Sequence, residues 1–206
     1  MSAVRLGLTV LMLVLLTSEL VAENWPCWRG PRGDGSSTET SVHGFCSSPV
    51  LYERLVILNG DHDGDAWVAG LDKSTGKTVW KVPREHKTRS YCTPIIRRIA
   101  GKDQLVMSGS KQIVSLDPQT GGAVWRIEGP TEQFVASMVY DGSRFYMAAG
   151  FPKHHVMSIR PDGSGNVTDT HVTWHSTEAK CYVPSPAVSQ GQLILRGEKH
   201  LFAIGK

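Results

Sequence analysis

The densest group of side chains that could do chemistry is the run DHDGD, Asp61–Asp65. Carboxylates at alternate positions are typical of the first half of a calcium loop, because this hard cation takes oxygen ligands. The EF-hand pattern then fails, since its glycine position holds Ala66 and its twelfth position, Asp72, lies in a repeated turn. The favoured interpretation is a solvated hairpin tip, and the competing hypothesis is a calcium site at Asp61, Asp63 and Asp65.

Histidines form a second group, between residues 154 and 175. A metal site needs two or three imidazoles that converge, and linear spacing does not show convergence. We therefore interpret this group as part of an ordinary polar loop. Its members are His154, His155, His171 and His175.

The four cysteines are the remaining candidates for covalent or metal chemistry. None belongs to a C-x-x-C pair, so the sequence gives no support for a zinc site. Three disulfide pairings are open, and buried free thiols are an equal alternative. The cysteines are Cys27, Cys46, Cys92 and Cys181.

The first residues indicate export. Arg5 precedes eleven apolar residues, 6–16, a run too short to span a bilayer comfortably, and Ala22 suits a cleavage site. We predict a signal peptide over residues 1–22, with an uncleaved membrane anchor as the alternative. The expected location is the periplasm or the exterior, with no transmembrane helix after cleavage.

Composition excludes several classes for the rest of the chain. Of 206 residues, 40% are hydrophobic and 20% are charged, which is typical of a globular protein rather than a disordered chain or a membrane bundle. A net charge of +3 argues against a nucleic-acid partner.

An internal repeat explains most of the remaining pattern. Leu-Asp-x-x-Thr-Gly-x-x-x-Trp occurs at residues 71–80 and again at 116–125, a shift of 45, and a degraded third copy ends at Trp174. A second landmark, Ser/Thr-Pro or Ser alone, falls at residues 48, 93, 137 and 185, with steps of 45, 44 and 48. Each period reads as strand, turn, strand, turn, strand, turn, strand. The sequence therefore predicts an all-β fold, a β-propeller of about four four-stranded antiparallel blades.

The repeated turn has a physical explanation. An aspartate at its start can accept backbone N–H bonds, a threonine hydroxyl can cap it, and a glycine supplies positive φ. The tryptophan that follows is expected to fill the gap between blades, so these residues are structural in our interpretation. They are Asp72, Gly76, Trp80, Asp117, Gly121, Trp125 and Trp174.

These motifs resemble the quinoprotein-type, or PQQ-like, β-propeller repeat. The opening Trp25-Pro26-Cys27-Trp28-Arg29-Gly30-Pro31 and the ending 200–206 are similar to those of exported bacterial propellers, common among planctomycete-like bacteria. Such proteins form rings of seven or eight blades, so this chain resembles a short or truncated form. We divide it into residues 23–46, a candidate closing strand, and repeats over 47–206, with blades at about 47–82, 92–127, 136–176 and 184–206.

Ring closure is the open question that the resemblance raises. The fourth repeat lacks its Thr-Gly-x-x-x-Trp strand, and residues 24–29 could supply it. A partly open ring and pairing of two chains as a homodimer are the alternatives, because an open ring exposes strand edges.

The resemblance implies two classes of function. The preferred one is an exported, non-catalytic binding or scaffold module for a protein, peptide or glycan. The alternative is a quinone-dependent alcohol or sugar dehydrogenase, or a fragment of one. In such enzymes the site includes a small ring closed by a disulfide between two adjacent cysteines, and a calcium ion held by acidic and amide groups. This sequence has no Cys-Cys. We therefore expect no catalytic residues and no cofactor, with PQQ and calcium as the cofactors of the alternative.

Overall fold

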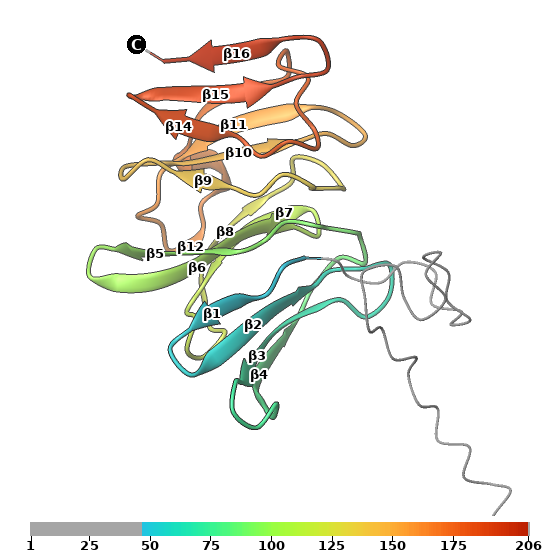
Figure 1. Ribbon diagram of the computed structural model, residues 1–206, viewed down its shortest axis with the longest axis vertical. Coiled ribbons are helices and arrows are strands. Elements are labelled where there is room, and N and C mark those ends of the chain that lie inside the picture. Colours follow the sequence, from blue (N-terminus) through green and yellow to red (C-terminus); the bar gives the residue numbers. More distant parts are fainter. Residues whose placement is uncertain (1–46, 206) are drawn as a thin grey trace, which may run out of the picture. The chain divides into compact units, whose positions relative to one another are not determined.

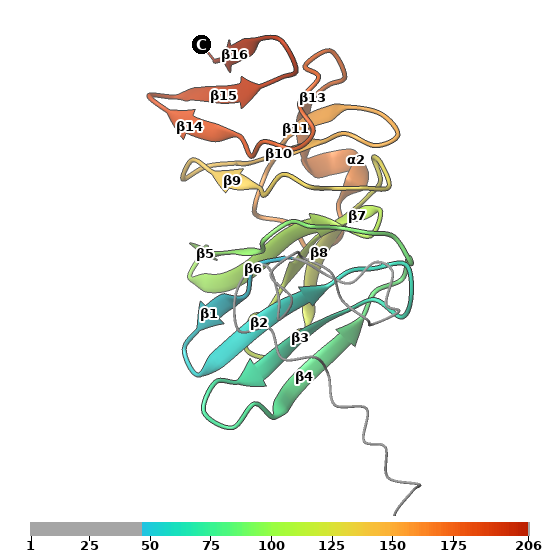
Figure 2. The same ribbon diagram turned by 45° about the vertical axis from the view of Figure 1, so that its right-hand side comes forward.

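The computed structural model describes residues 47–205, which lie in one compact unit, His43–Lys206. These residues form mainly antiparallel sheets (Figure 1) and one short helix (Figure 2). The strands of blade 1 are β1 (Val50–Tyr52), β2 (Leu55–Gly60), β3 (Trp67–Asp72) and β4 (Thr78–Pro83). Those of blade 2 are β5 (Ile95–Ile99), β6 (Lys102–Gly109), β7 (Gln112–Leu116) and β8 (Ala123–Glu128).

The second half of the chain gives two further blades. Blade 3 contains β9 (Val139–Tyr140), β10 (Phe145–Ala149), β11 (His155–Ile159) and β13 (Val172–Ser176). Blade 4 contains β14 (Ala187–Ser189), β15 (Gln192–Arg196) and β16 (Leu201–Ile204). Blades 1 to 3 thus have four strands in chain order, and blade 4 has three among the described residues. The predicted all-β fold of about four blades is confirmed.

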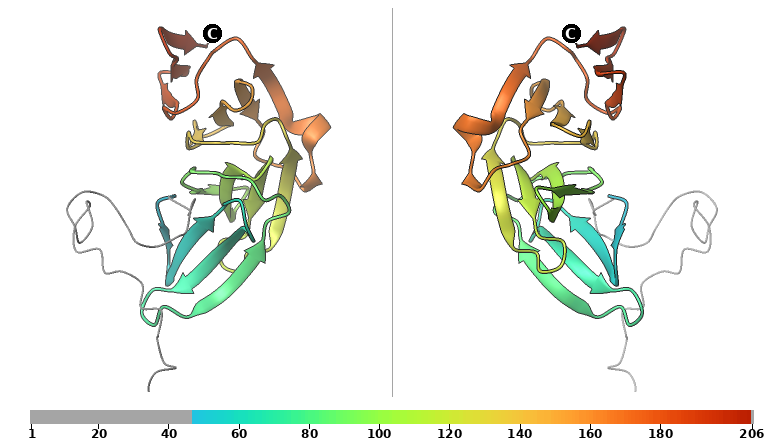
Figure 3. Two further views of the ribbon diagram at one scale, coloured as in Figure 1. Left: turned by 90° about the vertical axis from the view of Figure 1, so that its right-hand side faces the viewer. Right: turned by 90° about the vertical axis from the view of Figure 1, so that its left-hand side faces the viewer.

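The blades follow one another in a row that does not close within the described residues (Figures 2 and 3). Each blade has a leading face, toward the preceding blade, and a trailing face, toward the next. Apolar side chains from one trailing face and the next leading face form the three cores of the molecule. Alternation along each strand sends successive residues to opposite faces, so each inner strand contributes to two cores. Ile96 faces blade 1, for example, and Ile95 faces blade 3.

Hydrogen bonds between equivalent positions tie the starts of the blades together. The Ser47 hydroxyl donates to the Cys92 carbonyl (2.7 Å), one repeat later. The Thr93 N–H donates to the Ser137 hydroxyl, and the Ser137 N–H donates to the Ser185 hydroxyl, each at 3.0 Å. We call these bonds the inter-blade chain. The hydroxyls of Ser137 and Ser185 accept two of them, which explains the Ser at this point of blades 3 and 4.

The repeated turn is held by its aspartate. Asp72 Oδ1 accepts bonds from the Ser74 and Thr75 N–H groups and from the Thr75 hydroxyl, each at 3.0 Å. These bonds hold the pKa of the Asp72 carboxyl below its usual range. Gly76 follows with φ +70°, a left-handed conformation that favours glycine.

Asp117 makes the same turn in blade 2, accepting from the Gln119 and Thr120 N–H groups at 2.7 and 3.2 Å. Gly121 has φ +74° there. The two copies of the repeated turn therefore fold alike.

The longer turn of the third repeat contains an unexpected element. Its residues form β12 (Gly165–Asn166) and helix α2 (Thr168–His171), and β12 pairs in parallel with β8 of blade 2. The Val167 N–H donates to the Arg126 carbonyl (2.9 Å), and the Val167 side chain is buried in the core between blades 2 and 3. This segment covers the outer edge of blade 2 and ties it to blade 3.

No helix within the described part of the chain is long and apolar enough to cross a membrane. The candidate signal, residues 1–22, and the candidate closing strand, 24–29, lie outside the described residues.

Candidate binding sites

The three carboxylates of the candidate calcium site lie in the loop between β2 and β3, and each faces a different cation. Their partners all come from the connection between β4 and β5, so ion pairs join these two loops. The pairs are Asp61–Arg84 (3.0 Å), Asp63–Arg89 (2.6 Å) and Asp65–Lys87 (2.8 Å).

The Asp61–Arg84 pair is buried, and the other two pairs are exposed to differing degrees. The Asp61 side chain is 0% exposed and the Arg84 side chain 5%. Arg84 also donates to the Gly109 carbonyl (2.6 Å), so its guanidinium bridges blade 1 and blade 2. Burial raises the pKa of the Asp61 carboxyl, and the charge and hydrogen bond of Arg84 oppose this rise.

These contacts bear on the calcium hypothesis. Within residues 47–205, no group of three His, Cys, Asp or Glu side chains is placed to hold a metal ion. A calcium ion bound by Asp61, Asp63 and Asp65 would have to displace three cations. Calcium binding at this loop remains a prediction that only a binding experiment tests.

Two of the histidines meet, contrary to the polar-loop interpretation. His155 begins β11 and His175 lies in β13, so both are in strands. The Nδ1 atom of His155 lies 2.8 Å from Nε2 of His175, and the rings are stacked with centroids 5.1 Å apart. Burial lowers the pKa of His155, and the neighbouring His175, Lys153 and His154 lower it further. The linear spacing could not show this pair because β11 and β13 become neighbours only in the folded sheet.

The other two histidines lie elsewhere. His154 contacts the Tyr182 ring edge-on, with centroids 6.4 Å apart. His171 is buried at the end of α2, with its Nε2 atom 3.5 Å from Asp162 Oδ1. The four histidines therefore do not converge.

Both described cysteines are buried free thiols, Cys92 and Cys181. Cys92 Sγ donates to the Ala136 carbonyl (3.0 Å) and accepts from the Ser108 hydroxyl (3.3 Å). Burial raises the pKa of Cys92 to about 12, so this thiol is a poor nucleophile. Cys27 and Cys46 lie outside the described residues.

The repeat tryptophans differ in what covers them. Trp80 Nε1 donates to the Pro118 carbonyl of blade 2 (3.2 Å), and the Trp80 ring packs against Gly121. Trp125 is fully buried, donates to Gln104 Oε1 within its own blade (2.9 Å) and lies 6.3 Å from the Phe145 ring of blade 3.

Trp174 is different, because it is 37% exposed. It lines a groove of about 490 Å³ between blade 3 and blade 4, together with Tyr146, Leu193 and Ile204. The repeated turn of blade 2 lies over Trp80 of blade 1, and the longer turn of blade 3 lies beside Trp125 of blade 2. The described part of blade 4 ends before the corresponding turn, so Trp174 fills its gap only in part.

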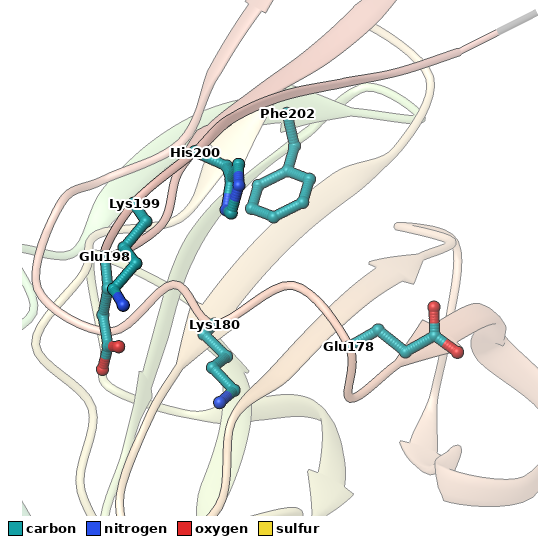
Figure 4. Close-up of a pocket in the computed structure, with 6 residues that line it drawn as sticks. All are labelled: Glu178, Lys180, Glu198, Lys199, His200 and Phe202. Atoms are coloured by element: carbon teal, nitrogen blue, oxygen red, sulfur yellow. The ribbon is translucent and has the colours of Figure 1, made fainter.

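A second hollow at the same junction lies among the loops (Figure 4). It has a volume of about 290 Å³ and includes Phe202 of β16 with charged side chains around it. The His200 ring lies 6.0 Å from the Phe202 ring. The charged residues come from two loops and are Glu178, Lys180, Glu198 and Lys199.

A third hollow, of about 330 Å³, shares Lys180 and Glu198 with the second one. Tyr182 and Val183 line it, and Val183 is 59% exposed. We call the two adjoining hollows the loop groove. It offers apolar and aromatic surface flanked by side chains of both charge signs.

The sequence did not reveal the loop groove. Its residues belong to the connection between β13 and β14 and to the loop between β15 and β16, outside both repeated landmarks. One feature of the sequence could have indicated it. Tyr182 and Val183 lie between two strands, at positions where the repeat has no recurring apolar or aromatic residue of its own.

The sheets, the repeated turns and the row of blades together define an all-β protein of PQQ-like propeller repeats. A family model described as "Outer membrane protein assembly factor BamB" matches residues 37–204, and the chain belongs to this family. No curated protein matches the chain.

Two solved structures resemble this chain. Quinohemoprotein alcohol dehydrogenase ADHIIG from Pseudomonas putida HK5 matches 78% of this chain and 33% of its own, with 13% identity and a TM-score of 0.53, which shows the fold alone. BamB from Moraxella catarrhalis matches 76% of this chain and 41% of its own, with 15% identity and a TM-score of 0.49. The chain thus spans less than half the length of these structures.

Proposed function

We propose that this protein is an exported, non-catalytic binding module that holds an extended segment of a protein partner in the loop groove. The carrying observation is the pair of adjoining hollows at the junction of blades 3 and 4. They combine the exposed Val183 and the aromatic Tyr182 and Phe202 with charges of both signs. Apolar anchors inside a charged rim are the usual composition of a peptide-binding surface.

The family supports a protein partner and a periplasmic location. Its description names an assembly factor for outer membrane proteins, and the first 22 residues have the pattern of an export signal. The partner we propose is therefore a protein encountered in the bacterial envelope.

Photo-crosslinking tests this proposal. A benzophenone amino acid at position 183 places the probe in the loop groove, and the same probe at Val79, 41% exposed on β4, is the matched control. With envelope extract of the source bacterium, we expect discrete protein adducts from position 183 that excess unlabelled protein removes. Equal adducts from both positions would contradict a specific groove.

The dehydrogenase alternative has a separate test. We expect the purified protein, supplied with pyrroloquinoline quinone and calcium, to reduce no dye with alcohol or sugar substrates. Quinone-dependent dye reduction would replace the binding role with an oxidoreductase role. Pairing of two chains is a distinct proposal, because it concerns the end faces of the row and not the loop groove.

A further inference from the structure

Inside the row of blades, each leading or trailing sheet face packs against a neighbouring blade. At each end of the row, one such face has no neighbouring blade among the described residues. The leading face of blade 1 carries Leu51, which is 71% exposed, and the trailing face of blade 4 carries Leu201, 74% exposed. They are the two most exposed large hydrophobic side chains in the described part of the chain.

Strand register shows what these faces correspond to in the interior. Leu51 pairs with Val56 across β1 and β2, as Ile96 pairs with Leu105 across β5 and β6. Ile96 is partly buried and Leu105 fully buried, because both pack against blade 1. The leading face of blade 1 therefore repeats a leading face that is covered in blade 2. Its apolar residues are the exposed Leu51, the partly buried Val56, Leu58, Trp67 and Leu71, and the buried Ala69.

The trailing face of blade 4 repeats that of blade 2 in the same way. Leu201 pairs with Arg196 across β16 and β15, as Ile113 pairs with Ser108 across β7 and β6. Ile113 is 0% exposed, because blade 3 covers it. The residues of this face are Ala187, Gln192, Ile194, Arg196, Leu201 and Ala203.

The inter-blade chain ends with matching groups. Ser185 accepts from Ser137, and its own N–H has no recorded hydrogen bond to residues 47–205. At the other end, Ser48 presents the hydroxyl of the same repeat position. Ser48 and Ser185 are exposed, whereas Thr93 and Ser137 between them are partly buried. An N–H of Ser185 that donates to Ser48 of another chain would continue the series by one step.

We propose that a second copy of this chain docks head-to-tail, with the leading face of its blade 1 on the trailing face of blade 4, so that two chains close one ring. Every blade contact inside the row joins a trailing face to a leading face, and a second copy supplies both kinds at once. Such a heterologous contact gives a closed ring when the rotation between copies allows it.

The test is the mass of the full chain in solution by light scattering, with one charged substitution in each face. We expect twice the 22.6 kDa of one chain at micromolar concentration. Leu51→Asp and Leu201→Asp should each weaken dimerisation by about 10- to 100-fold, since each buries a carboxylate against apolar side chains. Both leucines are exposed in the single chain, so each variant should keep the wild-type urea midpoint at concentrations where all the proteins are monomeric. Phe151→Asp, at an exposed site between β10 and β11 of blade 3 and on neither end face, should dimerise like wild type.

Mixing the two variants identifies the orientation. Leu51→Asp retains a native trailing face and Leu201→Asp a native leading face, so an equimolar mixture should recover a dimer through one native junction. A dimer weakened by only one substitution would mean that like faces meet, which overturns the proposal. So would a dimer that neither substitution affects, a mixture without recovery, or a head-to-tail polymer that grows with concentration.

A monomer at all concentrations would overturn the proposal as well, and hydrogen exchange then identifies what covers the end. Protection of the amides of β16 that disappears on deletion of residues 23–46 would assign the edge of blade 4 to the chain's own N-terminal segment. Neither result depends on the loop groove, so the proposed binding role is judged separately.

Discussion

Alanine at two equivalent glycines isolates the contribution of a single inter-blade tryptophan. Gly76 and Gly121 occupy the same turn position with φ of +70° and +74°, so alanine carries the same backbone strain in both, about 1–2 kcal/mol. They differ in their neighbours. A Cβ at Gly76 meets nothing within 4 Å, whereas a Cβ at Gly121 lies 2.6 Å from the Trp80 ring and 2.8 Å from Val82.

The overlap at Gly121 must be relieved by moving the Trp80 ring, which also bonds to the Pro118 carbonyl. Overpacking of this kind costs about 1–3 kcal/mol beyond the backbone strain. We therefore expect a loss in unfolding free energy of about 1–2 kcal/mol for Gly76→Ala and about 2–5 kcal/mol for Gly121→Ala.

Urea unfolding followed by tryptophan fluorescence measures both losses under the same conditions. The two substitutions should then be repeated in a Trp80→Ala background, where the extra cost at Gly121 should fall because only the contact with Val82 remains. Equal losses in the wild-type background, or an excess at Gly121 that is undiminished without Trp80, would refute the argument that this ring sits on the turn of the next blade.

Four further predictions concern charged, titrating and reactive groups. Arg84→Ala should lower the unfolding free energy by about 3–5 kcal/mol, because it leaves the buried Asp61 carboxylate unpaired. Lys87→Ala, at an exposed ion pair, should leave the urea midpoint unchanged. Similar effects of both substitutions would refute the distinction between the buried and the exposed pair. Because the folded pKa of His155 is lowered, the unfolded chain binds more protons, so this group costs stability as pH falls below its unfolded pKa of about 6.5. His155→Gln should flatten the slope of stability against pH between about 7 and 5, and an unchanged slope would assign it to other groups. Peptide mapping after iodoacetamide treatment at pH 8 should find Cys92 modified only in denaturant, since burial raises its pKa to about 12; modification in the native protein would show that the blade junction opens. Equilibrium dialysis should measure the same calcium binding for the wild-type protein and for Asp63→Asn. Weaker binding by Asp63→Asn would establish the calcium site.

The elements that local sequence determines could be predicted. The turn of Asp72 and Gly76 is made from residues within five positions of one another, and Asp117 and Gly121 repeat it, so both type and spacing are visible in the sequence. The period of about 45 residues then implies one sheet per repeat. For the same reason the incomplete fourth sheet was predictable, because the described part of blade 4 has no such turn.

What the sequence could not reveal depends on contacts between distant residues. Asp61 and Arg84 are 23 positions apart, and nothing in either loop indicates that they pair. The parallel strand β12 needs the outer edge of blade 2 beside it, so the same residues read only as a longer turn. His155 and His175 meet because two strands that are not consecutive in the chain pair in one sheet.

A repeat also leaves undecided whether a given position is core or surface, because that depends on the place of the blade in the row. Ile113 and Leu201 hold the same register position, and their exposures are 0% and 74%. Apolar residues persist at the end faces although no described residue covers them. At about 25 cal/mol per Å² of apolar surface, covering both faces would contribute substantially to the free energy of association.

The end faces and the loop groove make two functions separable by substitution. Val183 lies in the groove and Leu201 on the trailing face, and both are exposed in the single chain. If partner binding needs only the groove, a crosslinker at position 183 should give the same adducts in a Leu201→Asp background, at the protein concentration where that variant is monomeric. If adducts disappear together with the dimer, the partner must bind across the junction of two chains. The groove would then be only part of a site that a second copy completes.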